Sequence, residues 1–73
     1  MNMKSGKIVI KLDEYLKKNK ISRSSLARNG GLRYDTILSY CRQNVTRLDT
    51  DTLAKLCIAL NCQISDILEF VED

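Results

Sequence analysis

Residues Arg23 to Tyr40 read RSSLARNGGLRYDTILSY, and this stretch decides how the chain folds. Its apolar residues stand at helical spacings on either side of a glycine pair. Leu26 suits the packed face of one short helix, and Gly31 suits the left-handed residue at which helices commonly end. Ile37 and Tyr40, three residues apart, share the inner face of a following helix. The pattern predicts two short helices that pack together through a tight turn.

Two helices joined in this way form a helix-turn-helix unit, which we place at about residues 22–41. Ser22 is a suitable N-cap, because a serine side chain can accept a hydrogen bond from the free N–H groups of a first turn. Apolar spacing and capping residues predict further helices on both sides of the unit. The expected helices are Leu12–Asn19, Arg23–Asn29, Arg33 or Tyr34 to Cys41, one capped by Asp49 or Thr50 and ending at Leu60, and Ile64–Glu69.

Apolar residues three, four and seven positions apart mark the faces that these helices should bury. The clearest stripe is in the fourth helix, where Leu53, Leu56, Cys57 and Leu60 stand at i, i+3, i+4 and i+7. The residues expected in the core are Leu12, Leu16, Leu26, Ile37, Tyr40, Leu53, Leu56, Cys57, Leu60, Ile64, Ile67 and Leu68. These patterns predict an all-α, compact five-helix fold.

A run of β-branched residues at Lys7–Lys11 (KIVIK) predicts a short N-terminal strand as an addition to this fold. A strand cannot stand alone, because its backbone N–H and C=O groups need partners. The candidate partner is Glu69–Val71, either in the same chain or in a second copy, and the second case would make a dimer. In the alternative interpretation, Ile8 and Ile10 only lead into the first helix.

The chain has 73 residues and no proline, which fits a single domain over residues 1–73 with a flexible tail at residues 1–6. A chain of this length buries only about 60–65% of its unfolded surface, so dimerisation would help its stability. No apolar run approaches the roughly 20 residues of a membrane helix, and the N-terminal lysines do not open a signal peptide. We therefore expect a cytoplasmic protein with no membrane partner.

Charge is divided unevenly along the chain. Residues 1–47 carry eleven Lys or Arg against three acidic residues, a net +8, whereas residues 48–73 carry one Lys against six acidic residues, a net −5. Such a division favours a basic face toward a polyanion and an acidic end directed away from it. Chance clustering on a solvated surface is the alternative, because charge runs alone are weak evidence. The helix-turn-helix unit lies in the basic part, which favours the first interpretation.

The three cysteines, Cys41, Cys57 and Cys62, are odd in number and not closely paired, which argues against a disulfide framework. A structural zinc site takes four Cys or His ligands, and the sequence has no histidine and no Cys-x-x-Cys pair. A cysteine nucleophile would lack a histidine base, and no set of converging carboxylates is evident. We therefore expect no metal, no cofactor, no catalytic residues and no enzymatic activity.

Short motifs through most of the chain carry a resemblance to a known family. They are Ile21-Ser22-Arg23, Leu26-Ala27-Arg28, Gly31-Leu32, Thr36-Ile37, Thr52-Leu53, Leu56-Cys57, Ala59-Leu60, Cys62-Gln63 and Asp66-Ile67-Leu68-Glu69-Phe70. Over about Ile8 to Val71 the chain resembles the Cro/repressor-type (XRE) helix-turn-helix regulators of phages and bacteria, with their lambda-repressor-like fold. The part from Thr52 to Phe70 makes the resemblance more specific than the short helix-turn-helix pattern does. It implies a nucleoid-associated transcriptional repressor or autoregulator that binds a palindromic double-stranded DNA operator as a homodimer.

The resemblance also implies which residues contact DNA, because such regulators place the start of their third helix at base edges in the major groove. The base-reading residues implied are Arg33, Tyr34, Asp35, Thr36 and Ser39. Arginine can bind guanine through two hydrogen bonds, and a carboxylate can accept one from cytosine. The phosphate-contacting residues implied are Ser22, Arg23, Arg42 and Arg47.

Four residues depart from the family pattern. Arg33 stands where Ser or Thr usually caps the third helix, and Gly30 stands where a small apolar residue is usual. Leu38 is expected on the outer side of the third helix, where a polar residue is usual, and Asp35 puts negative charge near the phosphates. The outer side therefore suits either thymine methyl groups or a protein. The alternative function is a protein-interaction module, like the phage inhibitors and antitoxins that resemble this fold.

Overall fold

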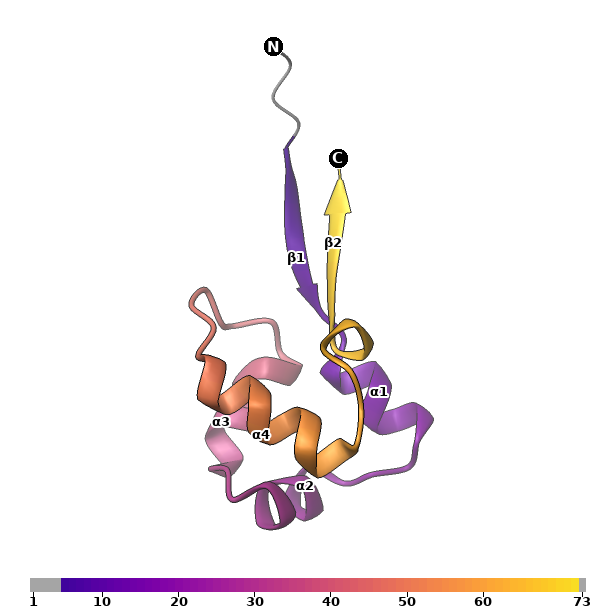
Figure 1. The fold of residues 1–73 in the computed structure, drawn as a ribbon, viewed down its shortest axis with the longest axis vertical. Coiled ribbons are helices and arrows are strands. Elements are labelled where there is room, and N and C mark those ends of the chain that lie inside the picture. Colours follow the sequence, from indigo (N-terminus) through magenta and orange to yellow (C-terminus); the bar gives the residue numbers. More distant parts are fainter. Residues whose placement is uncertain (1–4, 73) are drawn as a thin grey trace.

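The computed structural model describes residues 5–72, and within them four α-helices form one body. The helices are α1 (Leu12–Lys18), α2 (Arg23–Gly30), α3 (Tyr34–Cys41) and α4 (Thr50–Leu60). A single 3-10 turn, η1 (Ile64–Asp66), follows α4. Two strands, β1 (Gly6–Ile10) and β2 (Leu68–Glu72), form a ribbon that projects from the body at the end opposite α2 (Figure 1). The fold is therefore mostly helical and contains the predicted unit, but an all-α fold of five helices is wrong.

Side chains close in sequence set where two of the helices begin. The Ser22 hydroxyl accepts a hydrogen bond from the Ser25 N–H (3.0 Å), and a carboxylate oxygen of Asp49 accepts one from the Thr52 N–H (3.0 Å). Both predicted caps are confirmed, with Asp49 rather than Thr50 as the N-cap of α4. Arg33 precedes α3 without a side-chain cap, as expected where Ser or Thr is missing.

All four helices end through a residue in the left-handed conformation. These residues are Lys20 (φ 55°), Gly31 (φ 64°), Gln43 (φ 62°) and Asn61 (φ 51°). The N–H that follows each of them bonds to a carbonyl five residues earlier, at 2.9–3.0 Å, in the pairs Ile21–Leu16, Leu32–Ala27, Asn44–Ser39 and Cys62–Cys57. This bond is the mark of the Schellman motif, which satisfies carbonyls that a helix end leaves free. The predicted helix ends at Gly31 and Asn61 are confirmed.

β1 and β2 pair in antiparallel register, with Ile8 opposite Phe70 and Ile10 opposite Leu68. The predicted strand is thus present, and its partner is the C-terminal segment of the same chain. Gly6, expected in the tail, opens β1, while residues 1–4 of that tail lie outside the described residues. The predicted helix over 64–69 is wrong, because the residues from Leu68 onward give their backbone hydrogen bonds to β1 instead.

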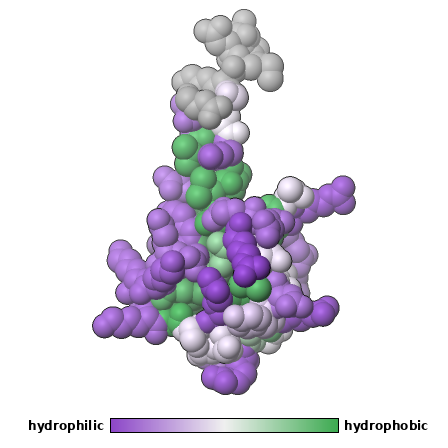
Figure 2. All heavy atoms as spheres, turned by 180° about the vertical axis from the view of Figure 1, so that it is seen from behind, coloured by the Kyte–Doolittle hydropathy of each residue, from purple (hydrophilic) through white to green (hydrophobic). Residues whose placement is uncertain are grey.

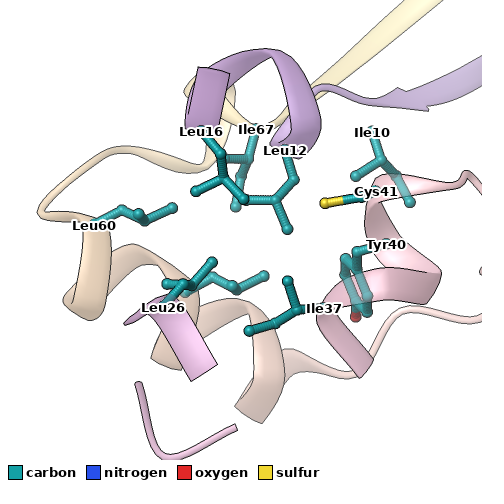
Figure 3. Packing of buried hydrophobic residues seen from close by; sticks show 10 residues of the cluster. Ile10, Leu12, Leu16, Leu26, Ile37, Tyr40, Cys41, Leu60 and Ile67 are labelled. Atoms are coloured by element: carbon teal, nitrogen blue, oxygen red, sulfur yellow. The ribbon is translucent and has the colours of Figure 1, made fainter. Parts of the chain in front are cut away.

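The core lies where the helices meet the base of the ribbon (Figure 3). Its buried members are Ile10, Leu12, Leu16, Leu26, Ile37, Tyr40, Cys41, Leu56, Leu60 and Ile67. Leu53, Cys57 and Leu68, also predicted, are half-buried and pack against it. Ile64 was expected in the core but is 45% exposed, because the helical spacing that would turn it inward does not continue past η1.

Gly30 lies where α2 approaches α4. A Cβ added there would stand 3.4 Å from the Cβ of Ala59 and 3.3 Å from a methyl group of Leu32. These distances are at the tight end of van der Waals contact, so the glycine permits a close approach of the two helices. α2 is thereby held against α4, and the turn into α3 starts from a fixed position.

Candidate nucleic-acid interface

α3 has an inner side committed to the core and an outer side that is not. Ile37, Tyr40 and Cys41 point into the core (Figure 3). The opposite side of the helix carries residues at i, i+3, i+4 and i+7. We name these residues the α3 outer stripe: Asp35, Leu38, Ser39 and Arg42. None of them is fully buried: Asp35 and Arg42 are exposed and Leu38 and Ser39 are half-buried, so each keeps surface for contact with another molecule.

Four of the five predicted base-reading residues lie at the N-cap and in the first turn of α3, Ser39 lies in its C-terminal half, and the five do not share one face. Asp35 is exposed and Ser39 half-buried, and both lie on the α3 outer stripe. Arg33 and Tyr34 are exposed at the start of the helix, and Thr36 is half-buried on its flank. Asp35 stands in the first turn, where the helix dipole favours a carboxylate, and makes no ion pair with any residue in 5–72.

At the N-terminus of α2, Arg23 forms an ion pair with a carboxylate of α1. A guanidinium nitrogen of Arg23 lies 3.1 Å from a carboxylate oxygen of Asp13 in α1, and Lys17 lies 3.0 Å from the other oxygen. Asp13 raises the pKa of Arg23, with smaller effects from the Cys41 thiol and the Tyr34 hydroxyl. Arg23 therefore sits between α1 and the start of α3, with one edge held by Asp13 and a side chain that is 37% exposed.

The other predicted phosphate contacts stand at the two ends of the helix pair. The Ser22 hydroxyl accepts the N-cap hydrogen bond of α2, and its O–H remains available as a donor. Arg42 and Arg47 are exposed beyond the C-terminal end of α3, in the segment that leads to α4. Arg42 is at the same time the last member of the α3 outer stripe. The structure thus brings Arg42 to the same side of α3 as Asp35 and Ser39.

Gln43 is a residue of this region that the sequence reasoning missed. Its side-chain oxygen accepts a hydrogen bond from the N–H of Ile10 (2.9 Å), and its side-chain nitrogen donates to the C=O of the same residue. The loop with Arg42 and Arg47 is thereby fastened to strand β1. No local signal marks this role, because Gln43 and Ile10 are 33 residues apart. The Asp13–Arg23 ion pair was also missed, because it joins two different helices. The Asp13–Lys17 pair has a local signal, since the two residues are four positions apart on one helix.

The described residues offer little to other kinds of chemistry. Within residues 5–72, no three His, Cys, Asp or Glu side chains come together as a metal site needs. Burial raises the pKa of the Cys62 thiol to about 11 and also raises that of Cys41, so both are protonated at neutral pH. No helix in the same part of the chain is long and apolar enough to cross a membrane.

None of the curated proteins compared with this chain matches it. The sequence model of the Cro/C1-type HTH DNA-binding domain matches residues 11–73, which include all four helices and strand β2 but leave out β1. The match covers most of the chain, and the helix-turn-helix geometry that it requires is present in α2 and α3. The chain therefore belongs to the Cro/C1-type helix-turn-helix DNA-binding domain family.

Proposed function

We propose that this DNA-binding domain is a sequence-specific transcriptional regulator that reads the major groove with α3. The α3 outer stripe is the observation that carries the proposal, since none of its four residues is fully buried. An α-helix with its side chains is about 10–12 Å across, and the major groove is about 12 Å wide. Asp35, Ser39 and the exposed Arg33 bring acceptors and donors that match base edges, and Leu38 suits a thymine methyl group.

The arginines around α3 supply the second part of the proposal. Arg23 comes before α3 and Arg42 and Arg47 come after it, which supports phosphate contacts on both sides of the proposed recognition helix. Such contacts fix the position of a recognition helix but carry no sequence information. The Asp13 carboxylate holds one edge of Arg23, which reduces the rotamer freedom that Arg23 would lose on contacting a phosphate.

We further infer that the protein acts as a homodimer on a palindromic operator and represses transcription, including that of its own gene. One eight-residue helix contacts few base pairs, and two copies related by a two-fold axis double the sequence that is read. Occupation of an operator is enough to block other proteins there, and a DNA-binding domain accomplishes that alone.

Selection from random double-stranded oligonucleotides with the purified protein tests this function. We expect an enriched palindrome with half-sites about one helical turn, roughly 10 base pairs, apart. The same selection with Asp35→Ala should return a motif altered at one position in each half-site. Recovery of a motif without symmetry would contradict the proposed homodimer. The absence of any enriched motif would contradict sequence-specific DNA binding.

A second function is favoured by one observation, the presence of Leu38 in the middle of the α3 outer stripe next to Asp35. An apolar residue and a negative charge also suit the surface of a partner protein, as in an inhibitor or antitoxin-like module. In that case a stoichiometric partner should remain bound in nuclease-treated host lysate and should be lost with Leu38→Ser. If the protein selects DNA and the Leu38→Ser variant retains the same bound proteins as the natural protein, this function is excluded.

A further inference from the structure

Cys57 and Cys62 stand at the two positions that the Schellman motif of α4 brings together. The N–H of Cys62 donates to the C=O of Cys57 (3.0 Å), and the N–H of Asn61 donates to the C=O of Ile58 (3.2 Å). Both bonds of the motif are therefore present, and side chains at its two outer positions commonly touch. Because Cα lies two bonds from the carbonyl oxygen and one bond from the nitrogen, the two Cα atoms are within about 7 Å, which a disulfide can span.

The same two positions at the other three helix ends carry no sulfur. They hold Leu16 with Ile21 in α1, Ala27 with Leu32 in α2 and Ser39 with Asn44 in α3. The first two pairs belong to the core or pack against it, as is usual at this motif. Cys57 and Cys62 also pack against the core, but they bring two reducible side chains together where the other ends have only packing or polar contacts.

The two thiols are neighbours in the fold and are open to small molecules. Burial raises the pKa of the Cys62 thiol to about 11, and Cys57 adds to this through its charge and through a side-chain hydrogen bond. An effect of this kind requires direct contact between the two side chains. Both cysteines are half-buried, whereas Cys41, the third, is only 9% exposed. Position and access thus single out Cys57 and Cys62 among the three.

We propose that Cys57 and Cys62 form an oxidation site, at which hydrogen peroxide converts the two thiols into a disulfide across the end of α4. The deprotonated Cys57 sulfur attacks one peroxide oxygen, the O–O bond breaks, and hydroxide leaves and takes up the thiol proton as water. Cys57 is then a sulfenic acid. The Cys62 sulfur attacks the Cys57 sulfur, the S–S bond forms, and the S–O bond breaks to release a second water that carries the Cys62 proton. Two electrons pass from the thiols to the peroxide.

The order of the two cysteines follows from their surroundings. Because Cys62 is protonated at neutral pH, the first attack on dissolved peroxide falls to Cys57. Cys62 then reacts with a sulfur that is already beside it, and this proximity offsets its small thiolate fraction.

The pair stands where the chain leaves the helical body for the ribbon. From Cys62 the chain passes through η1 into β2, and hydrophobic surface continues from the body along this ribbon (Figure 2). Local opening of the segment would expose Ile67 of the core together with that surface. A disulfide at Cys62 holds the start of the segment against α4, so oxidation should stabilise this end of the fold.

Peptide mapping after peroxide treatment tests the site. Chymotrypsin cleaves after Tyr40 and Leu60, so the three cysteines fall on separate peptides. We expect the peptides of Cys57 and Cys62 to be joined, about 2 Da lighter than the two reduced peptides together, and to come from the monomer band of a non-reducing gel. Cys57→Ser and Cys62→Ser, which both retain Cys41, should give no joined peptides. Cysteine peptides that only gain oxygen, a link to Cys41, or joined peptides found only in covalent dimers would overturn the proposal.

Thermal unfolding tests whether the disulfide fits the native end of α4. The oxidised natural protein should melt roughly 4–8 °C above its reduced form, and dithiothreitol should reverse the gain. Peroxide-treated Cys62→Ser should show no gain. An oxidised protein that melts at or below the temperature of the reduced protein would contradict the fit. Neither measurement involves DNA, so the oxidation site and the proposed regulatory function stand or fall separately.

Discussion

At the scale of single residues, Gln43 joins two parts of the molecule that no regular element connects. Its side-chain amide bonds both backbone groups of Ile10, as a neighbouring strand would. The same residue ends α3 in the left-handed conformation, which is unfavourable for a residue with a Cβ. Its side chain and its backbone therefore act on stability in opposite directions.

Two substitutions separate these effects. Gln43→Ala should lower the free energy of unfolding by about 1–3 kcal/mol, because two hydrogen bonds of about 0.5–1.5 kcal/mol each are lost. Gln43→Gly loses the same bonds but relieves the left-handed strain, so it should be less destabilising by about 1 kcal/mol. Urea unfolding of the two variants measures the difference. A glycine variant as unstable as the alanine variant would show that the strain is absent.

Arg33 and Arg42 are expected to differ in what they contribute to DNA binding. Arg33→Ala should weaken binding to the selected operator by about 1–3 kcal/mol and relax one base position, because a base contact is lost. Arg42→Ala should weaken specific and random DNA alike, since a phosphate contact carries no sequence information. Fluorescence anisotropy on both kinds of DNA measures this, with Lys55→Ala on α4 as the control. Equal losses on both DNAs for Arg33→Ala would remove its base-reading role.

Asp13 gives stability a dependence on pH. Its hydrogen bond with Lys17, and next that with Arg23, lower its pKa below the ordinary value. A carboxyl group with a lowered pKa in the folded state stabilises the fold above its unfolded pKa of about 3.9, and this stabilisation is lost as pH falls through the folded pKa. Melting temperatures of the natural protein and Asp13→Asn should therefore differ at pH 7 and converge as pH falls through the lowered pKa of Asp13. A constant gap across this range would contradict the prediction.

At the scale of elements, the helices depend on chemistry close to their ends. Two begin with a side-chain cap, and all four end in a Schellman motif. Only one of the four left-handed positions is a glycine, and the others are Lys20, Gln43 and Asn61. The helix ends are therefore set by sequence-local bonds, but three of them carry backbone strain that substitution can relieve.

Lys20 provides the test of this strain. Its side chain makes no hydrogen bond or ion pair within residues 5–72, so Lys20→Gly should raise the free energy of unfolding by up to about 1 kcal/mol. Lys18→Gly, at the last helical residue of α1, should instead lower it, by up to about 1 kcal/mol, because glycine is unfavourable in a helix. Thermal or urea unfolding compares the pair. The same sign for both substitutions would contradict the interpretation.

At the scale of the whole molecule, α3 and the ribbon lie at separate places in the fold. The α3 outer stripe and the arginines beside it lie on the body, and the ribbon projects away at the end opposite α2 (Figure 1). Gln43 links the two, because it joins the loop that carries Arg42 and Arg47 to β1.

The binding of DNA by the whole molecule should depend steeply on salt. With three arginines per subunit on phosphates, a dimer releases about six counterions, so the slope of log K against log salt should be about −5. Affinity for the selected operator should then fall about 10³-fold between 50 and 200 mM salt. Arg47→Ala should reduce the slope by about two for the dimer. A flat response over this range would remove phosphate contacts as the main source of affinity.

The sequence was sufficient wherever the relevant interactions are local. Ser22, Gly31, Asp49 and Asn61 mark helix ends correctly, because caps and Schellman bonds join residues only three to five positions apart. The inner face of α3 followed from the spacing of Ile37 and Tyr40 for the same reason. The residues that contact DNA stay a prediction, since they rest on the family's geometry and on the exposure of the α3 outer stripe.

The segment after α4 was decided by tertiary structure. Ile64–Glu69 has apolar residues at helical spacing, yet it forms one 3-10 turn and then a strand. Helical hydrogen bonds are made within four residues, whereas Leu68 to Glu72 bond to Gly6 to Ile10, about 60 residues away. The same distance in sequence concealed the role of Gln43. The sequence by itself thus determined the four helices, their packed faces and a strand at the N-terminus with Glu69–Val71 as its candidate partner. Only the tertiary structure decided that this strand pairs within the same chain and that Leu68–Glu72 is a strand instead of the end of a helix, because those hydrogen bonds join residues about 60 positions apart.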